Sequence, residues 1–492
     1  MKGEGVMPGY VPVIGLEVHA QLLTRSKIFC GCANRFGDAP NTNTCAVCLG
    51  LPGALPVLNR AAVELAMRMA LATGCVINGR SIFARKNYFY PDLPKGYQIS
   101  QYDRPLATGG SISIDVDGQT RRIGLTRIHL EEDAGKLVHE GFSSTEGASG
   151  VDFNRSGVPL IEIVGEPEIR SPQEAYLYLQ RLKSVLTYTE VCDGNMEEGS
   201  LRCDANVSIH EKGSAFGTRV ELKNLNSFRN VQRALEFEIA RQERVLEEGA
   251  KVVQQTRLYD AGSGETRPMR TKEEAHDYRY FPEPDLLPLE VDEAWIGKVR
   301  AGLPELPSER KARFIRERGI PEADAHLLTL EKPLADYFEQ AGGLSGEWRE
   351  TAKWIVRDVL RWAKEGKLDS AKLGDRFPPA RLAAIVRARA SGSITAASAA
   401  EIFEEAWTSG KEPDAIIRDR GLSRITDESA IAAAVARAIE ENPKQVGQYR
   451  QGKEAVFGYL VGQVMRATGG KAPPDVVNRL LKDALGKPAG QD

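Results

Sequence analysis

Stretches of strict residue alternation constrain the fold of this chain more than any other feature. In residues 201–210, apolar or small side chains alternate with polar ones, and the polar positions are Arg202, Asp204, Asn206, Ser208 and His210. Because successive side chains of a β-strand point to opposite faces of its sheet, this pattern predicts a strand with one apolar and one polar face. Polar side chains stand about 7 Å apart along such a face. A row of Arg, Asp and Asn at that spacing can hold a phosphate and a metal ion together, although the pattern alone also fits an ordinary exposed face.

The same design recurs in two other segments. Residues 13–22 alternate with Glu17 and His19 on the polar side, and residues 217–224 alternate with Glu221 and Lys223 on theirs. Only a short glycine-containing link separates the second segment from the strand at 201–210. We therefore expect these two strands to pair antiparallel, with their charged faces in register.

The pattern of the whole chain predicts an α+β protein. Residues 59–73, 172–188 and 231–248 carry apolar residues at helical spacing, and strand-like alternation disappears from about residue 293. At 492 residues the chain exceeds a single core. The predicted domains are an N-terminal domain with an antiparallel β-sheet and flanking helices, an all-α linker domain, an all-α tail domain and a disordered end, over residues 1–292, 293–411, 412–487 and 488–492.

Composition limits the classes of function. The net charge is −3 at pH 7, so any contact with nucleic acid must come from a local patch or be shared with a partner. The N-terminus has no apolar signal core, and the most apolar long stretch, residues 51–77, is interrupted by Arg60, Glu64 and Arg68. We therefore expect a cytoplasmic protein, in which the seven cysteines do not indicate a disulfide framework.

Four of the cysteines have the spacing of a metal site. The pattern is Cys30-X-Cys32, twelve residues, and then Cys45-X-X-Cys48. Four thiolates on two turns suit tetrahedral zinc, and a site without an open position is structural rather than catalytic. The alternative is four unrelated core cysteines, as we expect for the remaining three, which stand singly in apolar patterns.

Carboxylates and one imidazole form a second candidate metal site. The predicted ligands are Glu17, His19, Glu162, Asp204 and one of the adjacent pair Glu131 and Glu132. Glu162 lies inside an apolar strand, where a carboxylate is costly unless it is paired or bound to a metal. An oxygen-rich set favours magnesium or manganese over zinc.

Basic side chains near these strands are candidate phosphate ligands: Lys86, Lys95, Arg202 and Lys223. The sequence has neither a P-loop nor a strand-to-helix Gly-X-Gly-X-X-Gly motif. If ATP binds, we expect it to bind in a cradle lined by the sheet. The chain also has no Ser-centred amidase signature, so hydrolytic release of ammonia is not encoded here.

Several long motifs resemble one known family. They include Ile-Gly-Leu-Glu-Val-His-Ala-Gln-Leu at 14–22, Arg-Lys-Asn-Tyr-Phe-Tyr-Pro-Asp at 85–92 and Met-Glu-Glu-Gly-Ser-Leu-Arg-Cys-Asp-Ala-Asn at 196–206, with further matches at 129–136, 221–228 and 277–285. In this order, the segments look like the B subunit of the aspartyl/glutamyl-tRNA amidotransferase. The match runs from about residue 12 to residue 487.

The resemblance implies an ATP-dependent kinase step on the side-chain carboxylate of misacylated Glu-tRNA(Gln) or Asp-tRNA(Asn). Ammonia from glutamine, released by the separate amidase or A subunit, then displaces phosphate. It also implies a heterotrimer with a small C subunit, a cradle-shaped catalytic domain and a tail domain that grips tRNA. By similarity, Mg²⁺ is held by Glu17, His19, Glu132, Glu162 and Asp204, and phosphate contacts come from Arg202, Lys223 and Lys86.

Residue alternation and resemblance disagree at one position. Alternation from Ile128 and Leu130 places Glu131 on the polar face, whereas the resemblance favours Glu132 as the ligand. A β-bulge at the strand end would reconcile the two. Two other functions remain open at this point: a non-catalytic tRNA-binding scaffold, and a self-sufficient glutamine-dependent ligase.

Overall fold

The computed structural model describes residues 9–138, 149–269, 277–422 and 428–486. By contacts the chain divides into two compact units, one up to Pro307 and one from Ser308 onward. The first holds the β-sheets, and the second is helical in its described part. The α+β prediction is confirmed. The disordered end expected at 488–492 lies outside the described residues.

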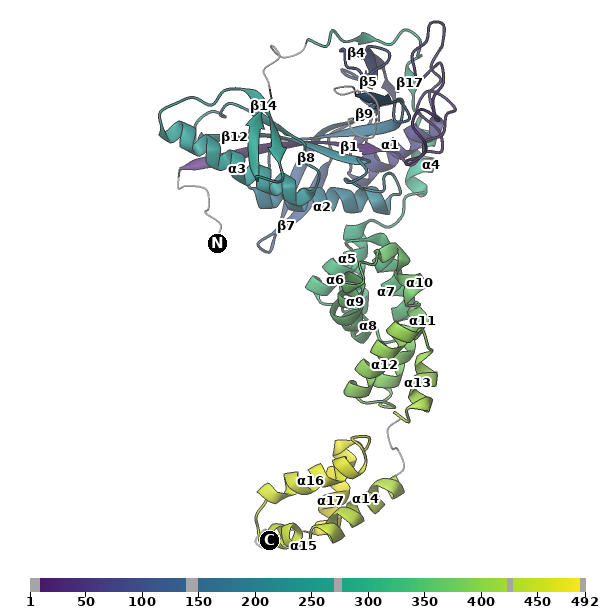
Figure 1. Ribbon diagram of the computed structural model, residues 1–492, viewed down its shortest axis with the longest axis vertical. Helices are drawn as coiled ribbons and strands as arrows, with labels where there is room; N and C mark the ends of the chain where they lie inside the picture. Colours follow the sequence, from purple (N-terminus) through teal and green to yellow (C-terminus); the bar gives the residue numbers. More distant parts are fainter. Residues whose placement is uncertain (1–8, 139–148, 270–276, 423–427, 487–492) are drawn as a thin grey trace. The chain divides into compact units, whose positions relative to one another are not determined.

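A ten-stranded mixed sheet is the centre of the first unit (Figure 1). Its strands are β1 Tyr10–Gln21, β2 Val76–Ile77, β6 Ala107–Thr108, β7 Ser111–Val116, β8 Gln119–Glu132, β11 Pro159–Gly165, β12 Leu201–Glu211, β13 Val220–Lys223, β14 Gln255–Asp260 and β15 Glu265–Pro268. The order is β15-β14-β13-β12-β1-β11-β8-β6-β2, and β7 pairs with β8. β12 and β13 pair antiparallel as predicted, but β13 and β14 are parallel.

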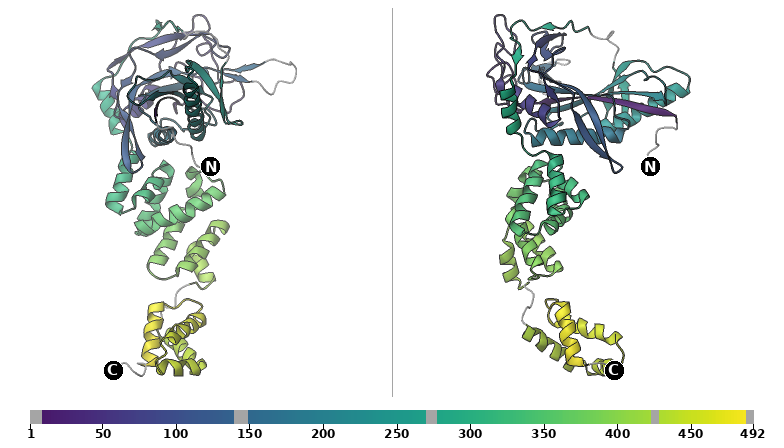
Figure 2. Two further views of the ribbon diagram at one scale, coloured as in Figure 1. Left: turned by 90° about the vertical axis from the view of Figure 1, so that its left-hand side faces the viewer. Right: turned by 180° about the vertical axis from the view of Figure 1, so that it is seen from behind.

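Three helices cover the apolar face of this sheet: α1 Arg60–Ala72, α2 Pro172–Tyr188 and α3 Phe228–Glu247. α2 and α3 lie side by side, with α3 against β12 (Figure 1). The long strand β1, drawn in purple, runs between β11 and β12 through the middle of the sheet (Figure 2). Because β1 has neighbours on both sides, its polar face is the centre of the opposite surface of the sheet.

Local signals explain where these elements begin and turn. The side chain of Ser227 accepts a hydrogen bond from the Asn230 amide, so α3 begins at Phe228 rather than at the predicted Val231. Between β7 and β8, Asp117 and Gly118 have φ of 50° and 78°, as a two-residue hairpin turn requires.

Shorter strands and one helix complete the first unit. The strands are β3 Arg80–Ser81, β4 Phe83–Asn87, β5 Tyr97–Gln101, β9 Lys136–Val138, β10 Gly150–Asp152, β16 Phe281–Pro282 and β17 Leu289–Glu290. Helix α4, Glu293–Ala301, packs on α1, where the Trp295 indole donates to Glu64 at 3.0 Å. The first unit therefore continues past the boundary predicted at residue 292.

The second unit contains two groups of helices. The first group is α5 Pro307–Arg318, α6 Glu322–Leu328, α7 Lys332–Ser345, α8 Trp348–Trp354, a π-helical turn Ile355–Val359, α9 Leu360–Glu365, a 3₁₀ turn Ser370–Lys372, α10 Leu373–Arg376, α11 Pro379–Ala390, α12 Ala396–Ser409 and α13 Pro413–Asp419. The second is α14 Glu428–Glu441, α15 Pro443–Arg450, α16 Ala455–Ala467 and α17 Pro474–Leu485, which share a core of their own. α13 packs on α11 and α12, so the helices after residue 412 do not all belong to the second group.

Candidate active site and metal centre

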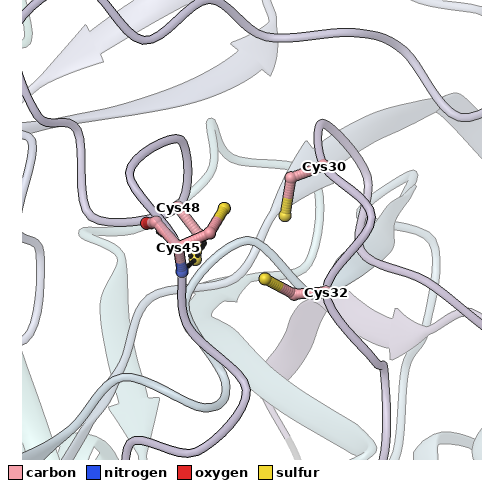
Figure 3. A group of neighbouring side chains, drawn as sticks. All are labelled: Cys30, Cys32, Cys45 and Cys48. Atoms are coloured by element: carbon pink, nitrogen blue, oxygen red, sulfur yellow. Dashed lines mark hydrogen bonds between the residues drawn. The ribbon is translucent and has the colours of Figure 1, made fainter.

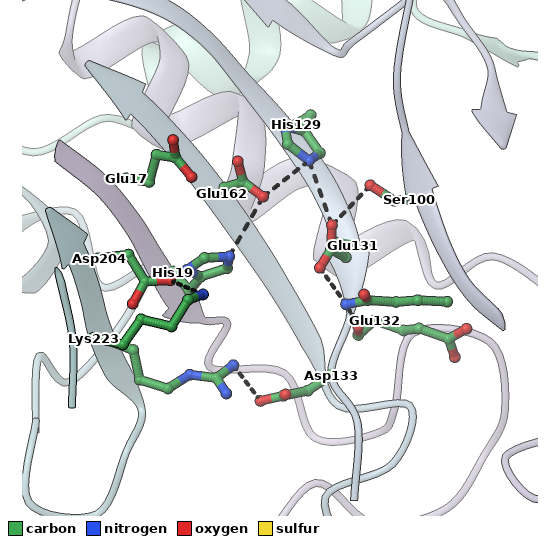
Figure 4. A network of polar contacts seen from close by, with 12 residues as sticks. Glu17, His19, Ser100, His129, Glu131, Glu132, Asp133, Glu162, Asp204 and Lys223 are labelled. Atoms are coloured by element: carbon green, nitrogen blue, oxygen red, sulfur yellow. Dashed lines mark hydrogen bonds and ion pairs between the residues drawn. The ribbon is translucent and has the colours of Figure 1, made fainter. Parts of the chain in front are cut away.

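The polar face of the central sheet gathers charged side chains from five adjacent strands. The register places Glu17 opposite Asp204, and His19 opposite both Arg202 and Glu162. On the outer sides, Glu162 faces His129 and Asn206 faces Glu221. Directly opposed residues project to the same face, so these side chains lie next to one another. Figure 4 shows five of them: Glu17, His19, His129, Glu162 and Asp204.

One group of three could hold a divalent ion. Ligand atoms of His19, Glu131 and Glu162 lie within 4.8 Å of one another. His19 Nε2 is 3.4 Å from Glu162 Oε2, and His129 Nε2 is 3.6 Å from the same oxygen. Two carboxylates with one imidazole suit magnesium or manganese.

Strong electrostatic coupling marks this group. Burial opposes ionisation of Glu162, but the nearby His129 and His19 hold its pKa well below the usual range. Burial would lower the pKa of His19, but its hydrogen bond and charge interaction with Glu162 raise that pKa above the ordinary value. Burial also opposes ionisation of Glu131, and chiefly the Lys86 ammonium lowers its pKa. Both carboxylates are thus held in the ionised form that a metal ligand needs.

The structure brings Glu131, not Glu132, into this group. Glu131 accepts hydrogen bonds from Ser100 Oγ at 2.8 Å and from the Gln98 amide, and its Oε2 lies 3.5 Å from His129 Nε2. Glu132 instead accepts from Lys95 and from the Ile99 amide, and it points away from the three ligands (Figure 4). This geometry disagrees with the choice of Glu132 that the resemblance favoured.

The end of β8 has no β-bulge that would turn Glu132 to the polar face. The register between β11 and β8 is continuous from Pro159–Glu132 to Val164–Arg127, and the single shift lies beyond that, at Gly165. Residue alternation therefore gave the correct face for Glu131.

Lys95 is not with the other candidate phosphate ligands. Its side chain is buried against Glu132 and lines a cavity of about 210 Å³.

A second acidic group adjoins the first. Glu17 Oε1 accepts from Asn206 Nδ2 at 3.0 Å, and Lys223 Nζ lies 3.2 Å from both Asp204 and Glu221. Burial, and then the charges of Glu162 and Asp204, raise the pKa of Glu17. This crowding of carboxylates is the environment that a bound cation relieves.

Arg202 and Lys86 supply positive charge beside these carboxylates. Arg202 Nη2 donates to Asp133 Oδ2 at 2.8 Å, and Gln21 Nε2 donates to the same oxygen at 2.8 Å. Asp133 is buried, which opposes its ionisation, but Arg202 and then Arg155 lower its pKa. Asp133 thus fixes the position of the guanidinium. Lys86 Nζ lies over the ring of Tyr278, 5.1 Å from the ring centre. Among the nearby carboxylates, Glu131 has the largest effect on the Lys86 ammonium.

The four predicted zinc ligands also come together. Thiol sulfurs of Cys30, Cys32, Cys45 and Cys48 lie within 4.8 Å of one another and point into one space between two loops (Figure 3). All four are free thiols. The hydrogen bond with Cys30 is the main cause that lowers the pKa of Cys48, with smaller effects from the Cys45 amide and the Lys27 ammonium. Four converging sulfurs, one already favoured as thiolate, fit a tetrahedral zinc ion.

Sequence reasoning missed three members of the polar face. The predicted site residues did not include His129, Asp133 or Glu221, although all three lie in segments that the sequence analysis discussed. Glu221 stood on a predicted polar face, and only the register with Asn206 places it near Glu17. His129 and Asp133 flank the acidic pair 131–132 and share a face with Glu131.

Comparison with known proteins decides the family. The model of the GatB/GatE catalytic domain matches residues 12–297, and the model named GatB domain matches residues 336–485. This chain belongs to the family of aspartyl/glutamyl-tRNA(Asn/Gln) amidotransferase B subunits. Members of this amidotransferase family are components of glutamine-hydrolysing carbon–nitrogen ligases.

Curated amidotransferase B subunits resemble the chain over nearly its whole length. The protein from Thermodesulfovibrio yellowstonii is 53% identical over 473 residues, which cover 96% of this chain and 98% of the relative. The protein from Geobacter sulfurreducens is 53% identical over 477 residues, or 97% and 99%. The protein from Halorhodospira halophila is 54% identical over 476 residues, or 96% and 98%.

In the described part of the chain, no helix is both long and apolar enough to cross a membrane.

Proposed function

We propose that this protein carries out the ATP-dependent step in the amidation of misacylated Glu-tRNA(Gln) or Asp-tRNA(Asn). The side-chain carboxylate of the esterified amino acid attacks the γ-phosphorus of ATP, and ADP leaves. Ammonia then attacks the resulting acyl phosphate, and inorganic phosphate leaves as the amide forms. The observation that carries this proposal is the meeting of carboxylates that could hold an ion with Arg202 and Lys223 on one face of the central sheet. Lys86, on the strand β4 of a smaller sheet, adds its positive charge beside Glu131.

Two groups on that face would hold Mg²⁺. One is His19, Glu131 and Glu162, and the other is Glu17 and Asp204 with Glu221 beside them. Magnesium offsets the negative charge that phosphoryl transfer brings together. The chain positions its carboxylates on hydrogen-bonded strands, so the ligand geometry does not depend on a loop closing.

Basic side chains would bind the phosphates of ATP. Arg202 is oriented by the buried Asp133, and its planar guanidinium can contact two phosphate oxygens at once. Lys223 lies between Asp204 and Glu221. Its ammonium could bind a phosphate oxygen while it keeps its ion pairs with both carboxylates. Without these cations, two anionic reactants would repel one another on an acidic surface.

The cysteine centre takes no part in this chemistry in our proposal. A closed Cys₄ site offers zinc no open position, so Zn²⁺ would brace the two loops. Ammonia would come from a glutaminase, the A subunit, and a small C subunit would complete a heterotrimer. The tail helices would contact the tRNA, as the family resemblance implies.

Product identification tests the proposal. The purified complex is supplied with ATP, glutamine and either Glu-tRNA(Gln) or Asp-tRNA(Asn), and the esterified amino acid is then analysed. We expect glutamine or asparagine on the tRNA only when ATP is present. Glutaminase activity from the isolated chain would instead favour the self-sufficient ligase.

A scaffold role makes a different prediction for the same assay. If the carboxylates are only structural ion pairs, Asp204→Asn leaves turnover of misacylated tRNA intact in the assembled complex. If they bind metal, as we propose, Asp204→Asn abolishes ATP-dependent turnover while tRNA binding persists.

A further inference from the structure

Four tyrosines flank the three-stranded sheet β16-β4-β5 and form a tyrosine cluster: Tyr88, Tyr102, Tyr278 and Tyr280. The rings of Tyr102 and Tyr280 stack with their centres 4.1 Å apart and their planes 6° from parallel. Tyr278 packs edge-on against Tyr280 and against Tyr88, with ring centres 6.0 Å apart in both pairs. Among the described residues, the core of the first unit includes none of these four rings. Core packing therefore does not explain the cluster.

Hydrogen bonds connect the tyrosine cluster to the proposed metal group. Tyr88 Oη donates to Gln98 Oε1 at 3.2 Å, and the Gln98 side-chain amide donates to Glu131. Ser100, two residues farther along β5, donates to the other carboxylate oxygen of Glu131 at 2.8 Å. Tyr102 is the next residue in this two-residue repeat. The cluster is thus separated from Glu131 by single side chains of β5.

The cluster combines aromatic rings with a positive charge. Lys86 is opposite Gln98 in the register of β4 with β5, and its Nζ lies 5.1 Å from the centre of the Tyr278 ring. Tyr280 covers one face of the Tyr102 ring, yet Tyr102 remains 51% exposed. Bases of nucleic acids stack on such rings, and a nearby cation offsets the charge of the rest of the ligand. These features favour a nucleotide over an apolar ligand.

The tyrosine cluster and Lys223 lie on opposite sides of the proposed metal group. Lys223 is on β13, and three strands, β12, β1 and β11, separate β13 from β8, which contains Glu131. The strand β5 of the smaller sheet contacts β8. Figure 4 accordingly shows Lys223 and Ser100 on opposite sides of Glu162.

The geometry of phosphoryl transfer decides which nucleotide belongs on the cluster. The attacking and leaving oxygens are roughly in line, on opposite sides of the phosphorus. With the phosphates of ATP bound at Lys223, the acceptor carboxylate approaches from the side of Glu131. This carboxylate belongs to an amino acid that is esterified to the terminal adenosine of the tRNA, so the adenosine enters on the side of the cluster.

We propose that the tyrosine cluster binds the adenine base of the aminoacylated 3′-terminal adenosine of the tRNA, with the base stacked on Tyr102. The inference rests on the proposed function and deepens it, because it assigns residues that position the esterified amino acid at the carboxylate face. Lys86 then lies where it offsets the negative charge of the acceptor side chain.

Fluorescence of the terminal base tests this stacking directly. The assembled complex is mixed with tRNA whose terminal adenine is replaced by 2-aminopurine, a base whose fluorescence falls when it stacks on an aromatic ring. We expect this decrease with wild type and with Tyr102→Phe, which keeps the ring. Tyr102→Ala and Tyr102→Leu should bind the tRNA without the decrease. Because Tyr102 is half-exposed, these variants should fold, and the use of two protects the test if one does not.

Kinetics provide a second measurement on the same variants. In Tyr102→Ala and Tyr102→Leu, KM for the misacylated tRNA should rise about 10- to 100-fold, which is the contribution of one base–aromatic stack. KM for ATP should stay within twofold of wild type. Phe36→Ala is the control, because Phe36 is a 70% exposed ring on the cysteine loops. It should behave as wild type in both measurements.

The alternative occupant is the adenine of ATP. The triphosphate of 2-aminopurine riboside is therefore added to the complex in place of ATP. A Tyr102-dependent decrease in the fluorescence of this nucleotide, with no such decrease for the tRNA, would assign the cluster to ATP and overturn the inference.

The outcomes separate this inference from the proposed function. A wild-type complex that forms no amidated tRNA from ATP and glutamine would refute the proposed function and the inference with it. A wild-type complex that amidates tRNA, together with a Tyr102→Ala variant that keeps the fluorescence decrease and the wild-type KM, would overturn the role of the cluster alone.

Discussion

The carboxylate face and the cysteine centre hold their side chains in opposite ways. The carboxylates stand on β1, β8, β11 and β12, whose hydrogen-bonded ladders fix the spacing of each row. The cysteines stand within residues 22–59, which contain no helix or strand apart from one bridge between Ser26 and Ala33. Strands can place ligands before an ion arrives, whereas loops of this kind depend on the ion for their own order. The same comparison explains why we assign catalysis to one site and support to the other.

Exchange of the adjacent acids gives the largest expected effect. Glu131→Gln removes a carboxylate from the proposed ion-binding group, and we expect ATP-dependent phosphorylation to fall about 10³-fold or more. Glu132→Gln leaves Lys95 buried without its partner, which costs about 3–5 kcal/mol of stability but spares the phosphoryl-transfer site. Phosphorylation assays and thermal unfolding of both variants separate these effects.

Glu211→Gln, at the exposed end of β12, is the matched control and should behave as wild type in both assays. An active Glu131→Gln beside an inactive but folded Glu132→Gln would restore the original choice of Glu132.

Selective metal removal tests the two regions against each other. Withholding Mg²⁺ should abolish phosphorylation and shift the thermal midpoint by less than about 2 °C, because the strands hold their own geometry. Removing zinc with a thiol-directed chelator should lower the midpoint by about 5 °C or more, since the loops lose their crosslink. Calorimetry with metal analysis measures both. The opposite pattern would contradict the division of roles.

Removal of a positioning acid should have a smaller effect on activity. Asp133→Asn takes away the charge that orients Arg202, and we expect kcat/KM for ATP to fall by about 10²-fold. Steady-state kinetics at varied ATP measure the change. Asp117→Asn, in the exposed hairpin turn, should leave these kinetics unchanged. An unaltered kcat/KM in Asp133→Asn would mean that Arg202 is held in place by other contacts.

The same substitution should change acid stability. Burial opposes ionisation of Asp133, but Arg202 and Arg155 lower its pKa below that of an unfolded chain. Its stabilising contribution is therefore complete above about pH 3.9 and is lost as pH falls toward the lower folded-state pKa. Between pH 5 and pH 3, measured midpoints should drop less in Asp133→Asn than in wild type. An equal drop in the two proteins would contradict this assignment.

The smallest effect is expected for a cysteine outside the metal centre. Cys203 lies buried on the apolar face of β12, away from the loops, as its place in the alternation predicted. Cys203→Ala should cost about 1 kcal/mol and leave zinc content and activity unchanged. Loss of zinc from this variant would show that packing on the apolar face of the sheet affects the cysteine loops.

Local patterns predicted much of this architecture. Alternation identified the strands that contain His19, Asp204 and Lys223, because a half-buried strand must repeat every two residues. Cysteine spacing identified all four members of the cysteine cluster, since residues on two short turns are close in sequence as well as in space.

The remaining features depend on contacts between residues that are distant in sequence, which local patterns do not predict. The antiparallel partnership of β1 with both β11 and β12 joins distant segments, so nothing local indicated that Glu162 and His19 are neighbours. Lys95 was predicted as a phosphate ligand because nothing local showed that its ammonium pairs with Glu132, which is also distant in sequence. The boundary after Pro307 was missed because the packing of Trp295 on α1 has no local signal.

Transfer of an oxygen atom tests the central claim most directly. Aminoacyl-tRNA whose side-chain carboxylate carries ¹⁸O at both oxygens is supplied to the wild-type complex with ATP and glutamine, and the inorganic phosphate released is analysed by mass spectrometry. If the carboxylate face carries phosphorylation, each phosphate carries one ¹⁸O atom from the substrate, and Glu162→Gln forms no labelled phosphate. Unlabelled phosphate from wild type, or labelled phosphate from Glu162→Gln at the wild-type rate, would contradict the account.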